Sequence, residues 1–428
     1  MDHRIKTLVL LFFLFLATEL SAQPTTEVER CRVYYTENAQ RFENWLTKRR
    51  TAMTRRSAEV YRIPVVVHVI HFGEAVGEGF NISKERIESQ IRVLNEDFRR
   101  KEGTPGFNDH PDGGDAMIEF VLARSSPSGE ATDGIVRIDI NSKEPPLFQG
   151  NPIASGAYFS YWDPELYFNI WSFPGVADTG LGYAAFPVSD LPGLEDEKDE
   201  DLMVPGIGLV DGISITAQHF GESDLKSKYN RGRTGTHEVG HFLGLFHLWG
   251  KNVNGKPSCD VDDFCEDTPP TGAATTSCSE NLKGCDGSRV MIENYMDYAD
   301  DVCMNIFTQD QIARMHTVLE NSPRRKSLLT SPGLNPPVTG TPDDFATRLE
   351  VYPNPVKDKL YIRLDAGYFY QNIRLTLYDR LGKVKLIQNH EQLQREELVI
   401  EMPRTNERIL FLHVETGRGS FYRKLMLK

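Results

Sequence analysis

The sequence has no excess of basic residues and, after its first 22 residues, no long hydrophobic run. Lysine and arginine total 48 against 61 aspartate and glutamate residues, which gives a formal net charge of −13 at pH 7. Such a chain lacks the basic surface that binds nucleic acid or anionic membranes, so we expect no nucleic-acid partner. The absence of a second apolar stretch of about 20 residues predicts no stable membrane span once the first segment is removed.

The first 22 residues have the pattern of a secretory signal peptide. Arg4 and Lys6 precede an apolar run from Thr7 to Ala17, and small residues stand just before Gln23. The run is short for a membrane span, and an uncleaved anchor is the alternative. We therefore expect an exported protein.

Cysteine is scarce as well, with six residues in 428. Export places them in an oxidising environment, where paired cysteines usually form disulfides. Four of them stand in one segment rich in glycine, aspartate and threonine: Cys259, Cys278, Cys285 and Cys303. We expect disulfides to stabilise this segment.

Residues 23–57 are polar and end in a basic cluster from Lys48 to Arg56. We interpret them as a pro-segment that is cleaved near its C-terminal end; a solvated helix followed by a linker is the alternative. Residues 58–325 then show strand and helix patterns. The expected strands are 63–72, 117–124, 135–140, 165–173, 182–187 and 212–216, and the expected helices are 83–99 and 234–247. This order of elements predicts an α/β domain.

Proline, glycine, threonine and aspartate dominate residues 326–345, which predicts a linker. Beyond it, residues 346–428 alternate apolar and polar side chains between turn signals such as Asn354-Pro355. This pattern predicts a small all-β sandwich domain.

The strongest chemical signal in the sequence is the stretch THEVGHFLGLFHLWG. Residues four apart share one face of a helix, so His237 and His241 can bind a single zinc ion. Gly244 allows a sharp turn that brings His247 to the same ion as a third ligand. Glu238 lies beside these ligands, where it can activate a water molecule in the open fourth position.

This spacing is the H-E-x-x-H-x-x-G-x-x-H pattern of metzincin metalloproteases. Met296 is suitably placed for the methionine turn beneath the metal; an ordinary core methionine is the alternative. With GYAAFP, GISIT, CDVDDFCEDTPP and ENYMDYADDVCMNIFTQDQIARM, the chain resembles the pappalysin family of metzincins over about residues 60–320. The resemblance implies an α/β metzincin-type zinc protease domain, with a mixed sheet, long helices and an active-site cleft. It also implies a secreted zinc endopeptidase acting on proteins or peptides.

The same resemblance assigns roles to further residues. Tyr298 would stabilise the oxyanion of the tetrahedral intermediate, which needs a hydrogen-bond donor; a packing tyrosine is the alternative. Residues 182–187 would bind an extended substrate at the edge of the sheet. The implied disulfides, with free thiols or other pairings as the alternative, are Cys259–Cys285 and Cys278–Cys303.

Five acidic residues crowd together after the zinc-binding stretch: Asp260, Asp262, Asp263, Glu266 and Asp267. Oxygen ligands at this density suit calcium, and like charges so close need a counter-ion. The family resemblance points to Asp263 and Thr268 as calcium ligands. A solvated acidic loop is the alternative.

Two cysteines, Cys31 and Cys265, remain outside these pairs. Cys31 lies in the expected pro-segment, and a thiolate is a good zinc ligand. Bound in the position of the water molecule, Cys31 would keep the precursor latent. A Cys31–Cys265 disulfide is an equal alternative.

Compact members of the pappalysin family favour basic residues directly after the scissile bond, so we expect Lys or Arg at P1′. The basic cluster at 48–56 fits self-cleavage by such an enzyme. Asp300 and Asp301, beside the methionine turn, are candidates for an acidic pocket wall. A solvated turn is the alternative, and the sequence does not choose between the two residues.

The stretches VYPNPVKDKLYIRL, LYDRLGKVKL and FYRKLMLK resemble the type A sorting domain of type IX secretion over about residues 347–428. One stretch, ERILFLHVETG, departs from the pattern because it lacks the usual Gly-x-Tyr. The resemblance implies passage through the periplasm to the cell surface or the medium, with the type IX machinery as a partner. A substrate- or carbohydrate-binding β-domain is the alternative.

For the chain as a whole, the alternative to an endopeptidase is a metal-binding adhesion or binding protein without catalysis. Glu238 argues against it, because a non-catalytic relative has no need of a carboxylate beside the first ligand. A zinc hydrolase of small molecules is a weaker alternative, since the expected edge strand suits an extended polypeptide.

Overall fold

The computed structural model describes residues 31, 39–50, 60–127, 130–141, 151–175, 180–187, 202–204, 207–250, 258–260, 262–335, 349–364, 372–380, 383–390, 397–416 and 419–428. The expected signal peptide, most of the basic cluster and residues 336–345 of the expected linker lie outside this set. Within it, no helix combines the length and the apolar character that crossing a membrane requires.

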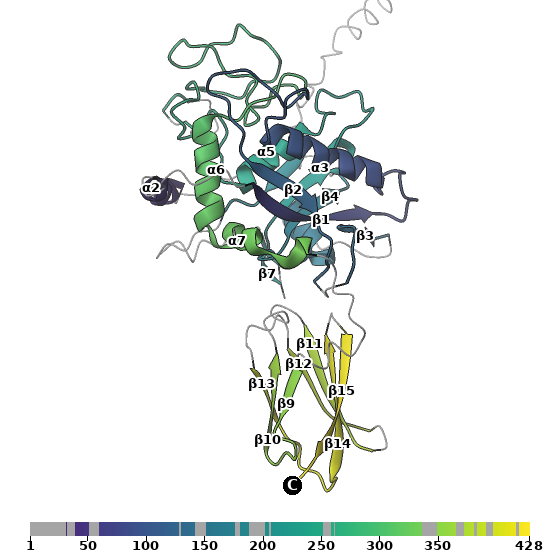
Figure 1. Ribbon diagram of the computed structural model, residues 1–428. Helices are drawn as coiled ribbons and strands as arrows, with labels where there is room; N and C mark the ends of the chain where they lie inside the picture. The colour runs from purple at the N-terminus through teal and green to yellow at the C-terminus, as the bar shows by residue number, and fades with distance from the viewer. Residues whose placement is uncertain are drawn as a thin grey trace, which may run out of the picture.

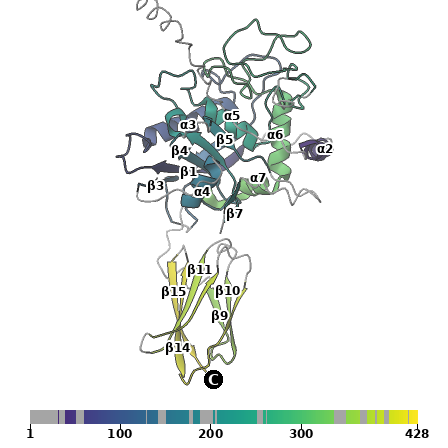
Figure 2. The same cartoon turned by 180° about the vertical axis from the view of Figure 1, so that it is seen from behind.

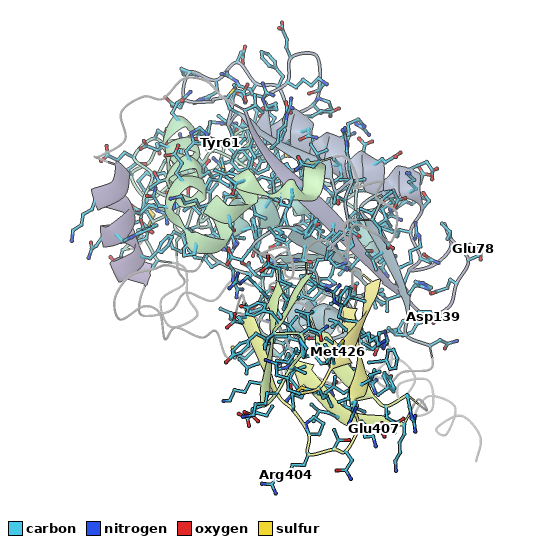
Figure 3. The ribbon with its side chains drawn as sticks, turned by 60° about the horizontal axis from the view of Figure 1, so that its bottom comes forward. Tyr61, Glu78, Asp139, Arg404, Glu407 and Met426 are labelled. Atoms are coloured by element: carbon cyan, nitrogen blue, oxygen red, sulfur yellow. A yellow bond between two sulfur atoms is a disulfide. The ribbon has the colours of Figure 1, made fainter. Side chains whose placement is uncertain are left out.

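A six-stranded sheet forms the centre of the α/β part (Figure 1). Its strand order is β2-β1-β4-β8-β5, and β3 pairs with the second half of β1. The bounds are β1 Tyr61–His71, β2 Ile118–Leu122, β3 Ile135–Asp139, β4 Phe168–Phe173, β5 Gly182–Ala184 and β8 Ile213–Thr216. Figure 3 shows Tyr61 and Asp139 at opposite ends of the β1–β3 pair. Each strand expected in this part overlaps one of these, and β5 is an antiparallel edge strand on an otherwise parallel sheet.

Strand β1 is apolar along almost its whole length because both faces of the sheet are covered. Its odd-numbered residues, such as Val67 and Val69, lie in the main hydrophobic core with residues of α3 (Lys84–Phe98) and α5 (Arg233–Phe242). Its even-numbered residue Ile70 packs on the opposite face with residues of α4 (Pro152–Phe159). The sheet is therefore the middle layer of a three-layer arrangement.

Two helices were expected in this part; one is confirmed and the other ends earlier than expected. The helix expected at 83–99 is confirmed as α3, which begins after Ser83; the Ser83 side chain accepts a hydrogen bond from Arg86 N. The helix expected at 234–247 is wrong at its end, because α5 stops at Phe242. Gly244 has φ +88°, a left-handed conformation that ends the helix.

The other described elements of this part are α2 (Ala39–Arg50), β6 (Met203–Val204), β7 (Gly208–Leu209), α6 (Gln309–Asn321) and α7 (Pro323–Lys326). A capping box starts α6, in which Thr308 and Gln311 satisfy each other's backbone amides. The chain then packs on the sheet as far as Asn335: Leu328 is buried in the main core, and Arg124 N donates to Gly333 O. We therefore place the beginning of the linker after Asn335.

The C-terminal part contains two antiparallel sheets, ordered β13-β10-β9 and β12-β11-β14-β15 (Figure 2). The bounds are β9 Leu349–Tyr352, β10 Lys359–Leu364, β11 Ile373–Tyr378, β12 Val384–His390, β13 Glu397–Glu401, β14 Ile409–Thr416 and β15 Gly419–Met426. One hydrophobic cluster takes residues from both sheets, including Ile362 and Leu412. The expected all-β domain is confirmed as two packed sheets.

Candidate active site

Three histidine rings converge at the C-terminal end of α5. His237 and His241 are one helical turn apart, and the turn at Gly244 returns the chain so that His247 faces them. The Nε2 atoms of the three rings lie 3.1 Å (His237–His241), 3.2 Å (His237–His247) and 3.0 Å (His241–His247) apart. Three imidazole nitrogens so close to one another suit a common metal ion.

Backbone carbonyls fix the orientation of two of these rings. His237 Nδ1 lies 2.7 Å from Tyr295 O, and His241 Nδ1 lies 2.8 Å from Leu245 O. A carbonyl only accepts, so each Nδ1 carries the proton and each Nε2 presents its lone pair to the centre. Burial lowers the pKa of His241 to about 4, which keeps this ring neutral at physiological pH. The third ring, His247, stacks on Trp249 at a centroid distance of 4.3 Å.

Glu238 is fully buried beside the three rings. Its Oε2 accepts a hydrogen bond of 3.3 Å from Cys31 Sγ. The edge strand β5 passes very close to it, since a side-chain carbon added at Gly182 would lie 2.3 Å from Glu238 Oε1. Only glycine permits this approach. The sequence predicts the GYAAFP stretch as a substrate-binding edge, but it gives no signal that Gly182 allows β5 to approach Glu238.

Met296 lies beneath α5. A side-chain carbon added at Gly240 of this helix would lie 2.4 Å from Met296 Sδ, so the two residues are in direct contact. Asn294 holds the turn, because its Oδ1 accepts a hydrogen bond from Met296 N at 2.9 Å and its amide pairs with Gln311 of α6. Met296 therefore packs directly against the helix that carries His237 and His241.

Tyr298 lies above the same rings, with centroid distances of 5.5 Å to His237 and 5.1 Å to His247. Its hydroxyl donates a hydrogen bond of 2.7 Å to Cys31 O. The phenol is therefore directed at a peptide carbonyl that lies beside the three histidines.

Cys31 itself lies inside the site. Its Sγ and the nitrogens of the three histidines lie within 4.8 Å of one another, and all four side chains are buried. Its backbone forms a parallel bridge with Gly182 of the edge strand. Cys31 and Cys265 do not form a disulfide with each other, and burial raises the pKa of Cys265 well above its ordinary value.

The structure contains the two disulfides that the resemblance implies, Cys259–Cys285 and Cys278–Cys303. Asp263 and Thr268 also lie together: Thr268 Oγ1 donates to Asp263 Oδ1 at 2.7 Å. Asp263 is buried, which raises the pKa of its carboxyl to about 7, and its Oδ2 has no hydrogen-bond partner among the described residues. A buried carboxylate oxygen of this kind fits a cation.

The other acidic residues of this segment are more exposed than Asp263. Asp260, Asp262 and Glu266 are exposed. Asp267 is half-buried, and its Oδ2 accepts a hydrogen bond from Asp310 N at 2.9 Å. Of the predicted cluster, Asp263 and Thr268 are the pair joined by a side-chain hydrogen bond among the described residues.

The two aspartates considered for the substrate pocket differ in their surroundings. Asp301 is buried, and its Oδ2 accepts hydrogen bonds from Arg231 N at 2.9 Å and Arg233 N at 3.2 Å, at the start of α5. Asp300 is partly exposed, and its Oδ1 lies 3.9 Å from Lys228 Nζ. Asp301 therefore supports the helix that carries the first two histidines.

Comparisons with known proteins agree with this geometry. A family model described as pregnancy-associated plasma protein-A matches residues 157–320, and one described as a secretion system C-terminal sorting domain matches residues 350–428. An extracellular metalloprotease of Arthroderma otae is 30% identical over 236 residues, which are 55% of this chain and 70% of that protein. One from Pyricularia oryzae is 30% identical over 270 residues, which are 63% of this chain and 77% of that protein.

Solved structures give the same picture. A promirolysin mutant from Tannerella forsythia has a TM-score of 0.57 and 32% identity, covering 71% of this chain and 97% of its own. Mature mirolysin from Tannerella forsythia, in complex with a cleaved peptide, has a TM-score of 0.51 and 34% identity, covering 64% and 97%.

Proposed function

Because the chain belongs to the pregnancy-associated plasma protein-A family of metallopeptidases and is a secreted zinc metalloendopeptidase, we propose that His237, His241 and His247 bind the zinc ion and that Glu238 is the general base. The observation that supports this most directly is the set of Nε2–Nε2 distances of 3.0–3.2 Å. Zinc, when bound, supplies Lewis-acid chemistry: it lowers the pKa of water and polarises a carbonyl.

The residues around the site have complementary tasks in this proposal. Glu238 takes the proton of the attacking water and passes it to the leaving amine. The Tyr298 hydroxyl donates a hydrogen bond to the oxygen that becomes negatively charged in the tetrahedral intermediate. Its present acceptor, Cys31 O, supports this role because it is a peptide carbonyl.

The test of this proposal is digestion of casein with and without 1,10-phenanthroline, alongside Glu238→Ala. We expect the chelator to abolish cleavage and added zinc to restore it. Glu238→Ala should bind zinc as well as the parent but lose on the order of 10²–10⁴-fold in kcat. Full activity of Glu238→Ala would refute the assigned role.

The substrate should bind in an extended form along β5. This strand is the edge of the sheet, and it passes directly beside Glu238. A substrate strand added at this edge would place a peptide bond at the site. The Cys31–Gly182 bridge supports this binding mode, because a second chain segment already pairs with this edge at one residue.

We further propose that the chain is made as a latent precursor in which Cys31 occupies the position of the catalytic water. Cys31 Sγ lies against Glu238 and the three histidines, and the Cys31 carbonyl engages Tyr298. Cys31→Ala should therefore give an uncleaved precursor with measurable activity. Unchanged latency of that variant would eliminate the switch.

We propose that a calcium ion binds at Asp263 and Thr268. Its ligand would be Asp263 Oδ2, which has no hydrogen-bond partner among the described residues. Bound calcium would stabilise the folded state by mass action, about 2.7 kcal/mol at 100 times Kd. Calcium should raise the melting temperature of the parent and not that of Asp263→Asn. Equal responses of both proteins would place calcium elsewhere.

We also propose a preference for Lys or Arg at P1′, supported by the pappalysin resemblance and by the acidic residues beside the methionine turn. Peptide-library profiling of the parent, Asp300→Asn and Asp301→Asn would measure it. We expect basic enrichment in the parent and its loss in one of the variants. A parent profile without Lys or Arg enrichment would refute the preference.

The C-terminal β-domain is proposed to bind the type IX secretion machinery. The support is the sorting-domain match over residues 350–428. In a host with that system, a chain without this domain should accumulate in the periplasm. Normal release of the shortened chain would contradict the role.

A further inference from the structure

Helix α2 belongs to the expected pro-segment, yet it packs firmly on the enzyme. Figure 1 shows it beside α6. Phe42, Trp45 and Leu46 of α2 are buried in one cluster with Val318 of α6, and Phe186 packs against them. The Phe42 ring meets the Phe186 ring edge to face at 5.7 Å. Apolar side chains on one face of a helix, buried in this way, form a specific docking contact.

A buried ion pair lies at the centre of this contact. Glu43 is 5% exposed and Arg314 is 1% exposed. Arg314 Nη1 donates to Glu43 Oε2 at 2.5 Å, and Nη2 donates to the other carboxylate oxygen. Bidentate pairing satisfies both groups, whereas removal of one partner leaves a buried charge uncompensated.

The same guanidinium group holds the segment that carries His247. Arg314 Nε donates to Gly244 O at 2.6 Å, and its guanidinium carbon lies 4.8 Å from the centre of the Phe246 ring. Gly244 and Phe246 lie in the turn between α5 and His247. The pro-segment therefore contacts the enzyme at two separate places: Cys31 at the histidines and α2 behind their turn.

We propose that α2 is an anchor that retains the pro-segment on the enzyme after the basic cluster at 48–56 has been cut. The proposal rests on the latency proposed above and deepens it. Two linked contacts dissociate together far more slowly than either alone, because each holds the other at a high effective concentration. A single cut after α2 then leaves Cys31 in place, and activation requires a second cut before α2 or displacement of the helix.

The anchor can be measured without reference to activity. A fluorescent peptide of residues 31–50 is titrated into the processed enzyme after zinc removal by a chelator, and anisotropy gives the Kd. We expect Glu43→Gln and Trp45→Ala peptides to bind on the order of 30-fold more weakly or worse. The matched control is Asn44→Ser, an exposed position on the same helix, which should bind like the parent peptide.

The retention itself is measured on the full chain. The precursor is nicked in the basic cluster and passed over a size-exclusion column, with protease activity followed before and after. We expect the parent pro-segment to co-elute with the enzyme and the enzyme to stay inactive, whereas the Glu43→Gln precursor should lose the segment and become active. The Glu43→Gln change leaves the mature enzyme unaltered, because residue 43 is no longer part of it.

The outcomes separate the anchor from the cysteine switch. A Cys31→Ala peptide that binds the metal-free enzyme like the parent but does not inhibit the zinc-loaded enzyme supports both. A parent peptide that binds with the expected Glu43 dependence but never inhibits would overturn the switch and leave the docking intact. Equal affinity of the parent, Glu43→Gln and Trp45→Ala peptides, or release of the parent segment on nicking, would overturn the anchor.

Discussion

Two backbone carbonyls fix the tautomers of two histidine rings in the site. Tyr295 O and Leu245 O each accept a hydrogen bond from the Nδ1–H of one ring, so that the Nε2 lone pairs of His237 and His241 face one another. The spacing of the histidines in the sequence predicts that they meet. It does not predict which carbonyls fix their tautomers, because those come from the methionine turn and from the helix end.

Tyr298→Phe should lower kcat by about 10²–10³-fold, because one hydrogen-bond donor to the developing oxyanion is lost. KM and zinc content should change little, since the ring and its contacts with His247 remain. Steady-state kinetics and metal analysis measure this. Tyr158→Phe, at an exposed tyrosine, is the control; equal kinetics for the two variants would show that the Tyr298 hydroxyl is not used.

His68 should make the fold sensitive to acid. It is buried between Trp171, Asn169 and Ser160, and burial lowers its pKa from 6.5 to about 4. The folded state keeps the ring neutral while the unfolded chain protonates it, so stability is complete above pH 6.5 and is lost as pH falls toward 4. At about 1.4 kcal/mol per pH unit, the full loss is about 3 kcal/mol.

His68→Gln should therefore flatten the dependence of unfolding free energy on pH between 6.5 and 4, measured by urea denaturation. The variant can be less stable at pH 7, because its contacts with Asn169 and Ser160 change. Replacement of the exposed His110 by Gln is the comparison. A slope for His68→Gln as steep as that of the parent would show that another group titrates.

At the scale of elements, the edge strand β5 and helix α5 form the site by close approach. Gly182→Ala should reduce kcat/KM strongly, because the added carbon would lie 2.3 Å from Glu238 Oε1 and must displace the strand or the carboxylate. Gly175→Ala is a suitable control, since its added carbon meets its nearest neighbour at 3.4 Å. Peptide hydrolysis by both variants measures the difference, and an unaffected Gly182→Ala enzyme would disprove the tight approach.

A buried ion pair joins the end of α5 to the sheet. Arg325 donates to both Asp211 oxygens, at 2.6 Å and 3.0 Å, and to Phe242 O at 2.7 Å. Asp211→Asn should cost about 3–5 kcal/mol of unfolding free energy, because it leaves a buried guanidinium without its counter-charge. Asp133→Asn, in the exposed pair with Lys84, should cost at most about 1 kcal/mol. Similar losses in urea denaturation would contradict this ranking.

Sequence patterns found the elements whose periodicity is simple and missed those that depend on tertiary contact. The apolar run of β1 and the spacing of α3 predict both elements closely. Gly244 also predicts the turn to His247, although the helix ends at Phe242, earlier than expected. The docking of α2 could not be predicted, because the Glu43–Arg314 pair joins residues 271 positions apart.

At the scale of the whole molecule, the α/β part and the β-domain have separate hydrophobic cores. Among the residues that the structure describes, the main core cluster and the cluster of the C-terminal sheets have no member in common. A chain that ends at Asn335 should therefore fold and keep its kcat/KM against peptides within about twofold. Circular dichroism and kinetics on the shortened and full chains measure this; aggregation of the shortened chain would show that the two parts depend on each other.

The two disulfides have a consequence for the cell that makes this enzyme. Their loops interleave along the chain, since Cys278 lies between Cys259 and Cys285 while Cys303 lies beyond both. The Cys278–Cys303 loop includes Met296 and Tyr298, which pack against α5 and the histidine rings, and the Cys259–Cys285 loop ties its first residues to the segment after the histidines. A reducing cytoplasm leaves this segment open, so the host would be spared digestion of its own proteins even by a molecule that lost its pro-segment too early. Protein purified from a reducing cytosol should then be inactive until it is oxidised.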